Sequence, residues 1–334
     1  MADQIELFSP ELDLGDPIGA VPPTADGLAL AQRLPSGLRL GTSSWTFPGW
    51  AGFVYRQRAS EQMLAQQGLK HYAQHPLMRS VGLDRTFYRP ASESEFRKWA
   101  LSVPEDFRFL VKAHAALTTP ADLVPSIPGA ATQVLRYLDA DYATQRVVEP
   151  AVAGLGARLG IILFQFPPLG VRHTHDPAQF ADALSLFLGR LPKGPQYAVE
   201  LRNRELLNPR YSDALALNGA THCFNVHPKM PDVLEQARIL GEHAWREKRV
   251  AIRWMLHPTH VYEAARARYF PFDRLVDPDL RSRLSIVELM SRMVARDHEL
   301  IVIANNKAEG SAPLSLKALA EEFVRQSEEE ETDL

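Results

Sequence analysis

Carboxylates and an arginine stand at the polar ends of apolar runs, where they could act on a bound molecule. Glu200 and Arg202 lie two residues apart near the end of one run, and Asp84, Thr86 and Tyr88 show the same spacing in another. Because strand side chains alternate between faces, residues two apart share a face. A carboxylate near a guanidinium can orient a substrate or stay ionised as a base, so Asp84 and Glu200 are candidate acid–base catalysts. A structural ion pair explains the pattern equally well.

Three cations, Lys112, Arg202 and Arg253, come from three different apolar runs. If the runs end at one opening, these side chains favour an anionic ligand such as a phosphate or carboxylate. We count Lys112 with Asp84 and Glu200 as catalytic candidates, and both arginines as substrate-binding residues. A neutral network, in which the cations pair with Asp84 and Glu200, is the competing interpretation.

Uncharged polar groups and flat aromatic rings occur near the same run ends. Such residues can hydrogen-bond and stack on a sugar or a base. For each aromatic residue, packing beneath the loops is the alternative. The predicted substrate-binding set is completed by Trp45, Tyr88, Gln165, Asn225, Asn305 and Asn306.

A metal site would need several His, Asp or Glu ligands in one place. The candidates are His114, His227 and His257, together with Asp84 and Glu200. This set could hold one ion, but it is too small for the trinuclear site of an endonuclease IV type of enzyme. We therefore assign no metal ligand, the sequence identifies no particular cofactor, and we keep a metal-assisted phosphodiesterase acting on nucleic acid as an alternative function.

Eight short apolar runs must position these residues. Their continuously apolar centres are typical of parallel strands covered on both faces, and the spacing leaves room for a helix between them. The pattern predicts a (β/α)8 barrel, in which active sites lie at the carboxyl ends of the strands. The runs span residues 38–45, 80–88, 107–114, 160–166, 196–203, 221–227, 249–256 and 299–306.

Helix signals separate several of these runs. Residues 92–95 read Ser-Glu-Ser-Glu, which is a capping box, and Asp176 with Pro177 provides an N-cap and a helix-starting proline. The connection over residues 115–159 is too long for a single helix, and residues 257–284 form a second long connection. Long loops at the carboxyl ends of barrel strands often carry function.

The composition, with 334 residues, 46% hydrophobic and 23% charged, indicates one globular domain. We expect an extended or disordered arm over residues 1–36, because prolines and scattered acids dominate it. The barrel domain is predicted over residues 37–325, and an acidic tail over residues 326–334.

Several compartments and partners are disfavoured. Residues 1–10 contain two acids and lack the pattern of a signal peptide, and no apolar run approaches the roughly 20 residues that span a bilayer. We therefore expect a cytoplasmic protein without a membrane partner. Proteins that bind duplex nucleic acid usually carry a broad basic surface, which is not expected of a chain with a net charge of −3. Nucleic acid is therefore not favoured as a partner. The single cysteine, Cys223, lies in an apolar run and is interpreted as a buried, inert thiol.

Ordered motifs across residues 38–322 resemble the domain of unknown function 72 family, the YecE-like proteins. The resemblance implies a TIM barrel with a pocket, but it supplies no reaction. The sequence departs from the family pattern at Gly82 and Asp84, where a glutamate and an asparagine are expected. The matching positions are residues 41–45, Trp50, Tyr55, residues 86–89, Trp99, Pro104, Phe107, Phe109, Lys112, residues 159–160, residues 164–168, residues 199–202, Arg253, residues 305–306, Gly310, Ala312 and Pro313.

The leading hypothesis is a barrel protein that binds a small polar ligand, anionic or sugar-like, at the carboxyl ends of its strands. If it also transforms the ligand, Asp84 or Glu200 would act as acid or base, in a hydrolase, lyase or isomerase. A noncatalytic ligand-binding or interaction module on the same scaffold is the second alternative, beside the metal-assisted phosphodiesterase.

Overall fold

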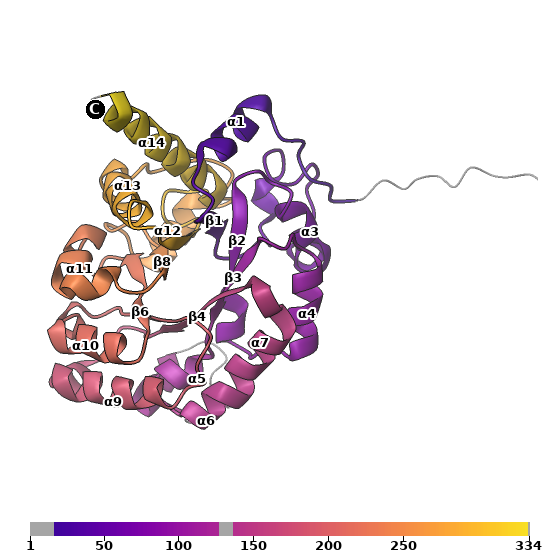
Figure 1. Ribbon diagram of the computed structural model, residues 1–334. Coiled ribbons are helices and arrows are strands. Elements are labelled where there is room, and N and C mark those ends of the chain that lie inside the picture. The colour runs from indigo at the N-terminus through magenta and orange to yellow at the C-terminus, as the bar shows by residue number, and fades with distance from the viewer. Residues whose placement is uncertain (1–16, 127–135, 333–334) are drawn as a thin grey trace, which may run out of the picture.

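Nine parallel strands form one sheet in the described part of the chain, which covers residues 17–126 and 136–332 of a computed structural model. The sheet curls into a nearly closed barrel in the order β6-β5-β4-β3-β2-β1-β9-β8-β7, and this confirms the predicted fold class (Figure 1). The strands are β1 (Leu38–Thr42), β2 (Met78–Leu83), β3 (Arg108–Lys112), β4 (Leu159–Gln165), β5 (Tyr197–Glu200), β6 (Thr221–His222), β7 (Phe224–Val226), β8 (Arg249–Trp254) and β9 (Glu299–Ala304).

The barrel closes through an interrupted strand. The sixth predicted run is split at Cys223 into β6, which pairs with β5, and β7, which pairs with β8. The backbone N–H of Cys223 donates to the carbonyl of Val199 at 2.8 Å, so the chain stays attached to β5 across the break. At the other side of the barrel, β1 pairs with both β2 and β9. All eight predicted runs contain strands.

Helices surround the barrel and fill the connections between strands (Figure 1). The predicted capping box of Ser92 and Glu95 begins one helix, and Asp176 caps another. The α-helices are α1 (Ala25–Arg33), α2 (Glu61–Met63), α3 (Leu69–Tyr72), α4 (Glu93–Leu101), α5 (Ala115–Thr118), α6 (Ala140–Ala143), α7 (Glu149–Leu155), α8 (Val171–Thr174), α9 (Pro177–Gly189), α10 (Pro209–Leu217), α11 (Val233–Leu240), α12 (Tyr262–Tyr269), α13 (Leu280–Val294) and α14 (Ala312–Thr332). The 3-10 helices are η1 (Pro48–Trp50), η3 (Asp84–Phe87), η4 (Ala121–Ser126), η6 (Gly156–Arg158), η7 (Arg204–Leu206) and η8 (Gly241–Trp245), and the π-helical turns are η2 (Leu64–Gly68) and η5 (Thr144–Val148).

Apolar side chains fill the barrel interior, which is therefore a packed core. Alternate residues of one strand point inward together, as Ile161 with Leu163 and Ile301 with Ile303 do. Cys223, which lies between β6 and β7, belongs to the same interior cluster, and its thiol is buried and forms no disulfide. Because the interior is filled, a ligand of this barrel must bind at an end of the strands.

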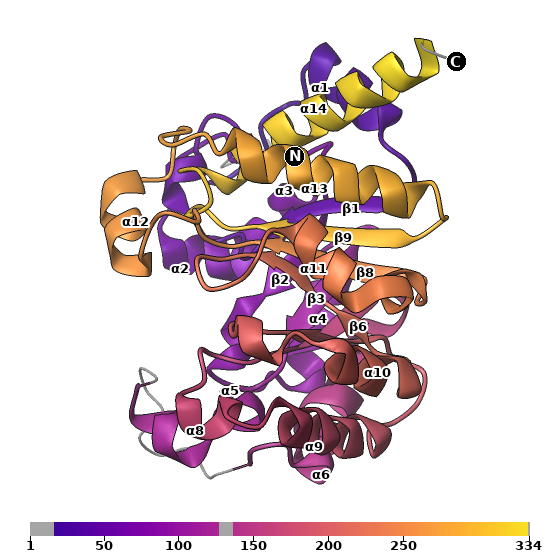
Figure 2. The same cartoon turned by 90° about the vertical axis from the view of Figure 1, so that its left-hand side faces the viewer.

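Near both ends of the described residues, the chain forms a helix where the sequence predicted an arm or a tail. Residues 25–33, inside the predicted extended arm, form α1, which begins because the Thr24 side chain accepts a hydrogen bond from the N–H of Gly27 at 3.1 Å. Figures 1 and 2 show α1 beside α14. Helix α14 continues to Thr332, through most of the predicted acidic tail. Residues 1–16 of the predicted arm lie outside the described residues.

The long connection 257–284 has its own anchoring contacts. Asp277 accepts hydrogen bonds from the hydroxyl of Tyr269 at 3.0 Å and from Arg268 at 2.7 Å, and it lies 3.0 Å from Nε2 of His260. Tyr269 also packs with Leu256 in a small apolar cluster separate from the main core. Figure 2 shows α12 at the same end of the barrel as α5 and α8, which also follow the carboxyl ends of strands. Of the helices in the described part of the chain, none is long and apolar enough to cross a membrane.

Candidate ligand site

A cavity of about 250 Å³ opens at the carboxyl ends of the strands. A larger hollow of about 440 Å³ lies outside the barrel over α9 and α10, and none of the predicted site residues line it. We call the first of these the mouth cavity. Most of the predicted site residues line it, namely Asp84, Tyr88, Lys112, Gln165, Arg202, Arg253 and Asn305.

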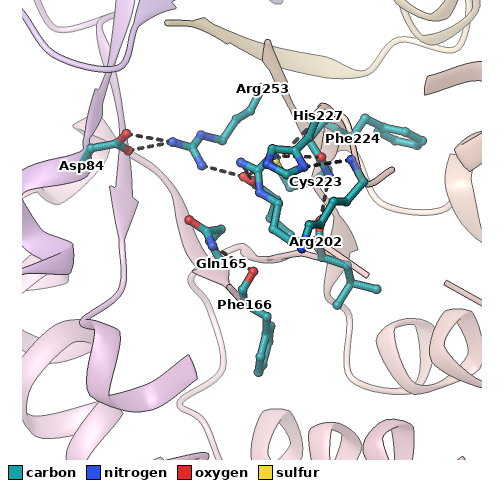
Figure 3. A network of polar contacts seen from close by, with 12 residues as sticks. Asp84, Gln165, Phe166, Arg202, Cys223, Phe224, His227 and Arg253 are labelled. Atoms are coloured by element: carbon teal, nitrogen blue, oxygen red, sulfur yellow. Dashed lines mark hydrogen bonds and ion pairs between the residues drawn. The ribbon is translucent and has the colours of Figure 1, made fainter. Parts of the chain in front are cut away.

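Arg253 links two carboxylates at the floor of the mouth cavity. Its Nη2 donates to both carboxylate oxygens of Asp84, at 2.8 and 2.9 Å, and its Nη1 donates to Oε2 of Glu200 at 2.6 Å. The guanidinium of Arg202 contacts the other oxygen of Glu200. Figure 3 shows Arg253 reaching toward Asp84, with Arg202 and His227 on its other side. Glu200 and Arg202 therefore meet, as their spacing predicted.

Burial and charge fix the protonation of this network. Burial alone would raise the pKa of the Glu200 carboxyl, but Arg202 and Arg253 outweigh it and hold the pKa at about 2. The two carboxylates likewise raise the pKa of Arg253 despite its burial. At neutral pH Glu200 is thus a permanent carboxylate. It orients the two arginines and is poorly suited to donate or accept a proton.

Lys112 is a buried lysine of this site whose pKa lies near neutral pH. Burial lowers the pKa of its ammonium to about 8, although the charge of Asp84 acts in the opposite direction. Its Nζ lies 3.8 Å from the centre of the Phe87 ring. Lys112 is therefore mostly protonated at neutral pH but can release its proton at low cost, as a general acid or base requires.

The chain turns directly after β2, and this corrects the predicted shared face of Asp84, Thr86 and Tyr88. Residues 84–87 form η3, because the Thr86 hydroxyl bonds to the carbonyl of Leu83 at 2.6 Å and lies 2.5 Å from the carbonyl of Lys112. Thr86 is buried in this role, whereas Asp84 and Tyr88 line the mouth cavity.

Three predicted binding residues lie outside the mouth cavity. Trp45 is buried and donates from Nε1 to the carbonyl of Leu64 at 2.9 Å. Asn225 is buried behind Arg202, from which it accepts a hydrogen bond at 3.3 Å. Asn306 accepts bonds at its side-chain oxygen from Nε1 of Trp50 and the N–H of Ala312, at 3.2 and 2.8 Å. In this structure these side chains hold strand ends and loops together.

Sequence reasoning missed two residues beside Asn305. The Nζ of Lys307 lies 3.2 Å from the side-chain oxygen of Asn305 and 4.3 Å from the ring centre of Tyr262, which lines the mouth cavity. Burial lowers the pKa of Lys307 to about 8, and Asp84 again opposes the shift. Lys307 lies three residues after the end of β9, directly after the predicted run 299–306, and this position is a usable signal. Tyr262 belongs to the long connection 257–284, for which the sequence pattern did not predict which side chains face the cavity.

Positive charge exceeds negative charge around the mouth cavity. Three cations line it and a fourth contacts Asn305 of its lining, whereas the two carboxylates among them, Asp84 and Glu200, are both bound to Arg253. The predicted neutral network is therefore only partly formed. The cations are Lys112, Arg202, Arg253 and Lys307.

The candidate metal ligands do not gather. Within residues 17–126 and 136–332, no group of three or more His, Cys, Asp or Glu side chains is placed to hold a metal ion. Nδ1 of His114 lies 3.0 Å from the Tyr142 hydroxyl, and His257 bonds within its own turn to Thr259. Asp84 and Glu200 face arginines, whose positive charge opposes a cation.

Solved structures of other proteins resemble this chain over most of its length. A DUF72 family protein of Enterococcus faecalis V583 shares 17% identity at a TM-score of 0.60, over 86% of this chain and 95% of that one. A DUF72 family protein of Thermotoga maritima MSB8 shares 21% identity at a TM-score of 0.54, over 87% and 99%. No curated protein matches the sequence significantly. The family model described as "Protein of unknown function DUF72" matches residues 39–333, so the chain belongs to the DUF72 family.

Proposed function

We propose that the mouth cavity binds a small ligand through a phosphate or carboxylate group. The observation that carries this proposal is the excess of buried positive charge, because an unbalanced set of desolvated cations is stabilised by a bound anion. Arg202 presents a planar guanidinium, and Lys112 and Lys307 present ammonium groups from other strand ends. A neutral sugar would leave this charge unbalanced.

Lys112 is the proposed proton carrier. Its pKa of about 8 lets it exchange a proton near neutral pH, whereas the Glu200 carboxyl, with a pKa of about 2, stays ionised. We therefore move the proposed acid–base role from Glu200 to Lys112, and assign Glu200 the positioning of Arg202 and Arg253. Asp84 positions Arg253 from the opposite side.

Equilibrium binding of inorganic phosphate tests the proposal. Phosphorus NMR would measure the dissociation constant for the wild type, for Lys112→Met, and for Lys317→Met as a control. Lys317 is an exposed lysine on α14 that pairs with Glu321. A charge-assisted contact contributes about 1.5–3 kcal/mol, so Lys112→Met should weaken binding by about tenfold or more. The control should bind as the wild type does. Equal binding by all three proteins, or tighter binding of glucose than of phosphate, would contradict the proposal.

A further inference from the structure

A second cavity adjoins the mouth cavity and shares one wall with it. This cavity, of about 200 Å³, lies between the loop after β7 and the long connection 257–284. His227 lines both cavities. We call the second one the side cavity. The two cavities are therefore neighbours that share His227 in their linings.

The side cavity has a different chemistry from the mouth cavity. Four of its lining residues, Val226, Met230, Pro231 and Pro258, offer apolar surface. Its carboxylate, that of Asp232, already accepts a hydrogen bond from the N–H of Leu234 at 2.9 Å as the N-cap of α11. Its cation, Arg281, is an exposed residue. The walls thus suit an apolar or aromatic group more than a second compact anion.

His227 is held neutral between the cavities. Its Nδ1 accepts a hydrogen bond from the N–H of Lys229 at 3.2 Å, which places the ring proton on Nε2. Burial, aided by the charge of Arg202, lowers the pKa of His227 to about 3. The shared wall is therefore an uncharged ring, past which an apolar group can extend at little electrostatic cost.

We propose that the ligand is an organic phosphate or carboxylate that occupies both cavities. Its anionic group lies among the cations of the mouth cavity, and its apolar or aromatic body passes His227 and packs against Met230 and the prolines of the side cavity. This inference rests on the proposed anion site and narrows its ligand class. Inorganic phosphate alone would leave the side cavity empty.

Paired binding measurements test the two-cavity ligand. The probes are inorganic phosphate, methyl phosphate and phenyl phosphate, titrated calorimetrically into the wild type, into Met230→Trp, and into Met63→Trp as a control. Met230 and Met63 are both half-buried methionines packed against the main core, but Met63 lies on α2 outside the side cavity. The indole at position 230 should fill the side cavity.

The wild type and Met63→Trp should bind phenyl phosphate roughly tenfold or more tightly than methyl phosphate, because a buried ring gains hydrophobic free energy. Met230→Trp should lose this preference and bind inorganic phosphate within about twofold of the wild type. A wild type that binds the three probes equally, or a preference that survives in Met230→Trp, overturns the inference and leaves the anion site standing. If no probe binds, the anion site fails, and the inference fails with it.

A second measurement covers the case in which Met230→Trp does not fold. In wild-type protein with 13C-labelled methionine methyl groups, phenyl phosphate should shift the Met230 methyl resonance, whereas methyl phosphate and inorganic phosphate should leave it in place. An unshifted Met230 resonance at saturating phenyl phosphate would overturn the inference.

Discussion

Arg253 determines the electrostatics of the site because a single guanidinium, 1% exposed, bonds to Asp84 and to Glu200. Removing a partner from such a buried network leaves an uncompensated charge, and that costs more than the network contributes as a whole. Arg202 depends on the same carboxylate, so Glu200 serves two cations at once.

Glu200→Gln should destabilise the fold by about 3–5 kcal/mol, because it leaves Arg202 and Arg253 facing each other without the carboxylate between them. Urea unfolding at neutral pH measures this loss. The matched control is Glu321→Gln, which removes an exposed carboxylate paired with Lys317 and should change the unfolding free energy by less than about 1 kcal/mol. Similar values for both variants would mean that the buried network is not what stabilises this end of the barrel.

Anion binding should depend on the protonation of Lys112. Its pKa is lowered to about 8, so the ammonium is present below this pH and is lost above it. Sulfate is a suitable probe because its charge is constant over this range. Its affinity should be at least about tenfold weaker near pH 9.5 than near pH 7. Lys112→Met should bind sulfate more weakly than the wild type near pH 7, and its affinity should fall less between about pH 7 and pH 9.5. The remaining decrease would come from the deprotonation of Lys307. A wild-type decrease that persists unchanged in Lys112→Met would exclude this role.

Residue types at strand ends were enough to predict most of the cavity lining. Asp84, Lys112, Arg202 and Arg253 were predicted from their places after apolar runs, and all four meet. The protonation state of Glu200 could not be predicted, because its low pKa depends on two arginines, Arg202 and Arg253, that come from different strands. The burial of Trp45 could not be predicted for a related reason, since it depends on tertiary packing beneath η2.

At the scale of elements, the site depends on where each strand stops. Strand β2 ends at Leu83, and η3 then turns Asp84 toward Arg253. The predicted run 80–88 could not reveal this turn, because the hydroxyl of Thr86 bonds to the carbonyl of Lys112, a residue of the neighbouring strand. The division of the sixth run at Cys223 is likewise a product of pairing with two different neighbours.

Close packing of β1 against β2 requires a glycine at position 41. A Cβ there would overlap the backbone carbonyl of Ser80, at the point where the β1–β2 register shifts. Gly41→Ala should therefore cost about 2–3 kcal/mol, as overpacking commonly does. Gly170→Ala is the control, since a Cβ at that position meets nothing within 4 Å. Thermal unfolding of both variants measures the difference, and equal melting temperatures would show that β1 can shift away from β2 without cost.

At the scale of the whole molecule, the barrel collects positive charge at one opening although the chain carries a net charge of −3. The fold class followed from eight apolar runs, since parallel strands covered on both faces leave a strong sequence signal. The helix α1 left a weaker signal among prolines, and the structure supplies its reason in the Thr24 cap and its position beside α14.

The acid stability of the protein should reflect Glu200. A carboxyl whose pKa is about 2 in the folded protein, against an ordinary value of 4.5, contributes stability above pH 4.5. This contribution is lost as the pH falls from about 4.5 toward 2, since the unfolded chain binds the proton more readily. Between about pH 6 and pH 3.5, the free energy of unfolding measured in urea should fall less in Glu200→Gln than in Glu321→Gln. Parallel losses in the two variants would contradict the low pKa.

The most direct test of the anion site is a crystal structure of the protein soaked in sodium selenate, with the selenium located by anomalous scattering. Selenate resembles a phosphate dianion in shape and charge. A selenium peak is expected in the mouth cavity, with selenate oxygens within hydrogen-bonding distance of Arg202 and Lys112. Selenium peaks only elsewhere on the molecule, in crystals whose mouth cavity is open to solvent, would contradict it.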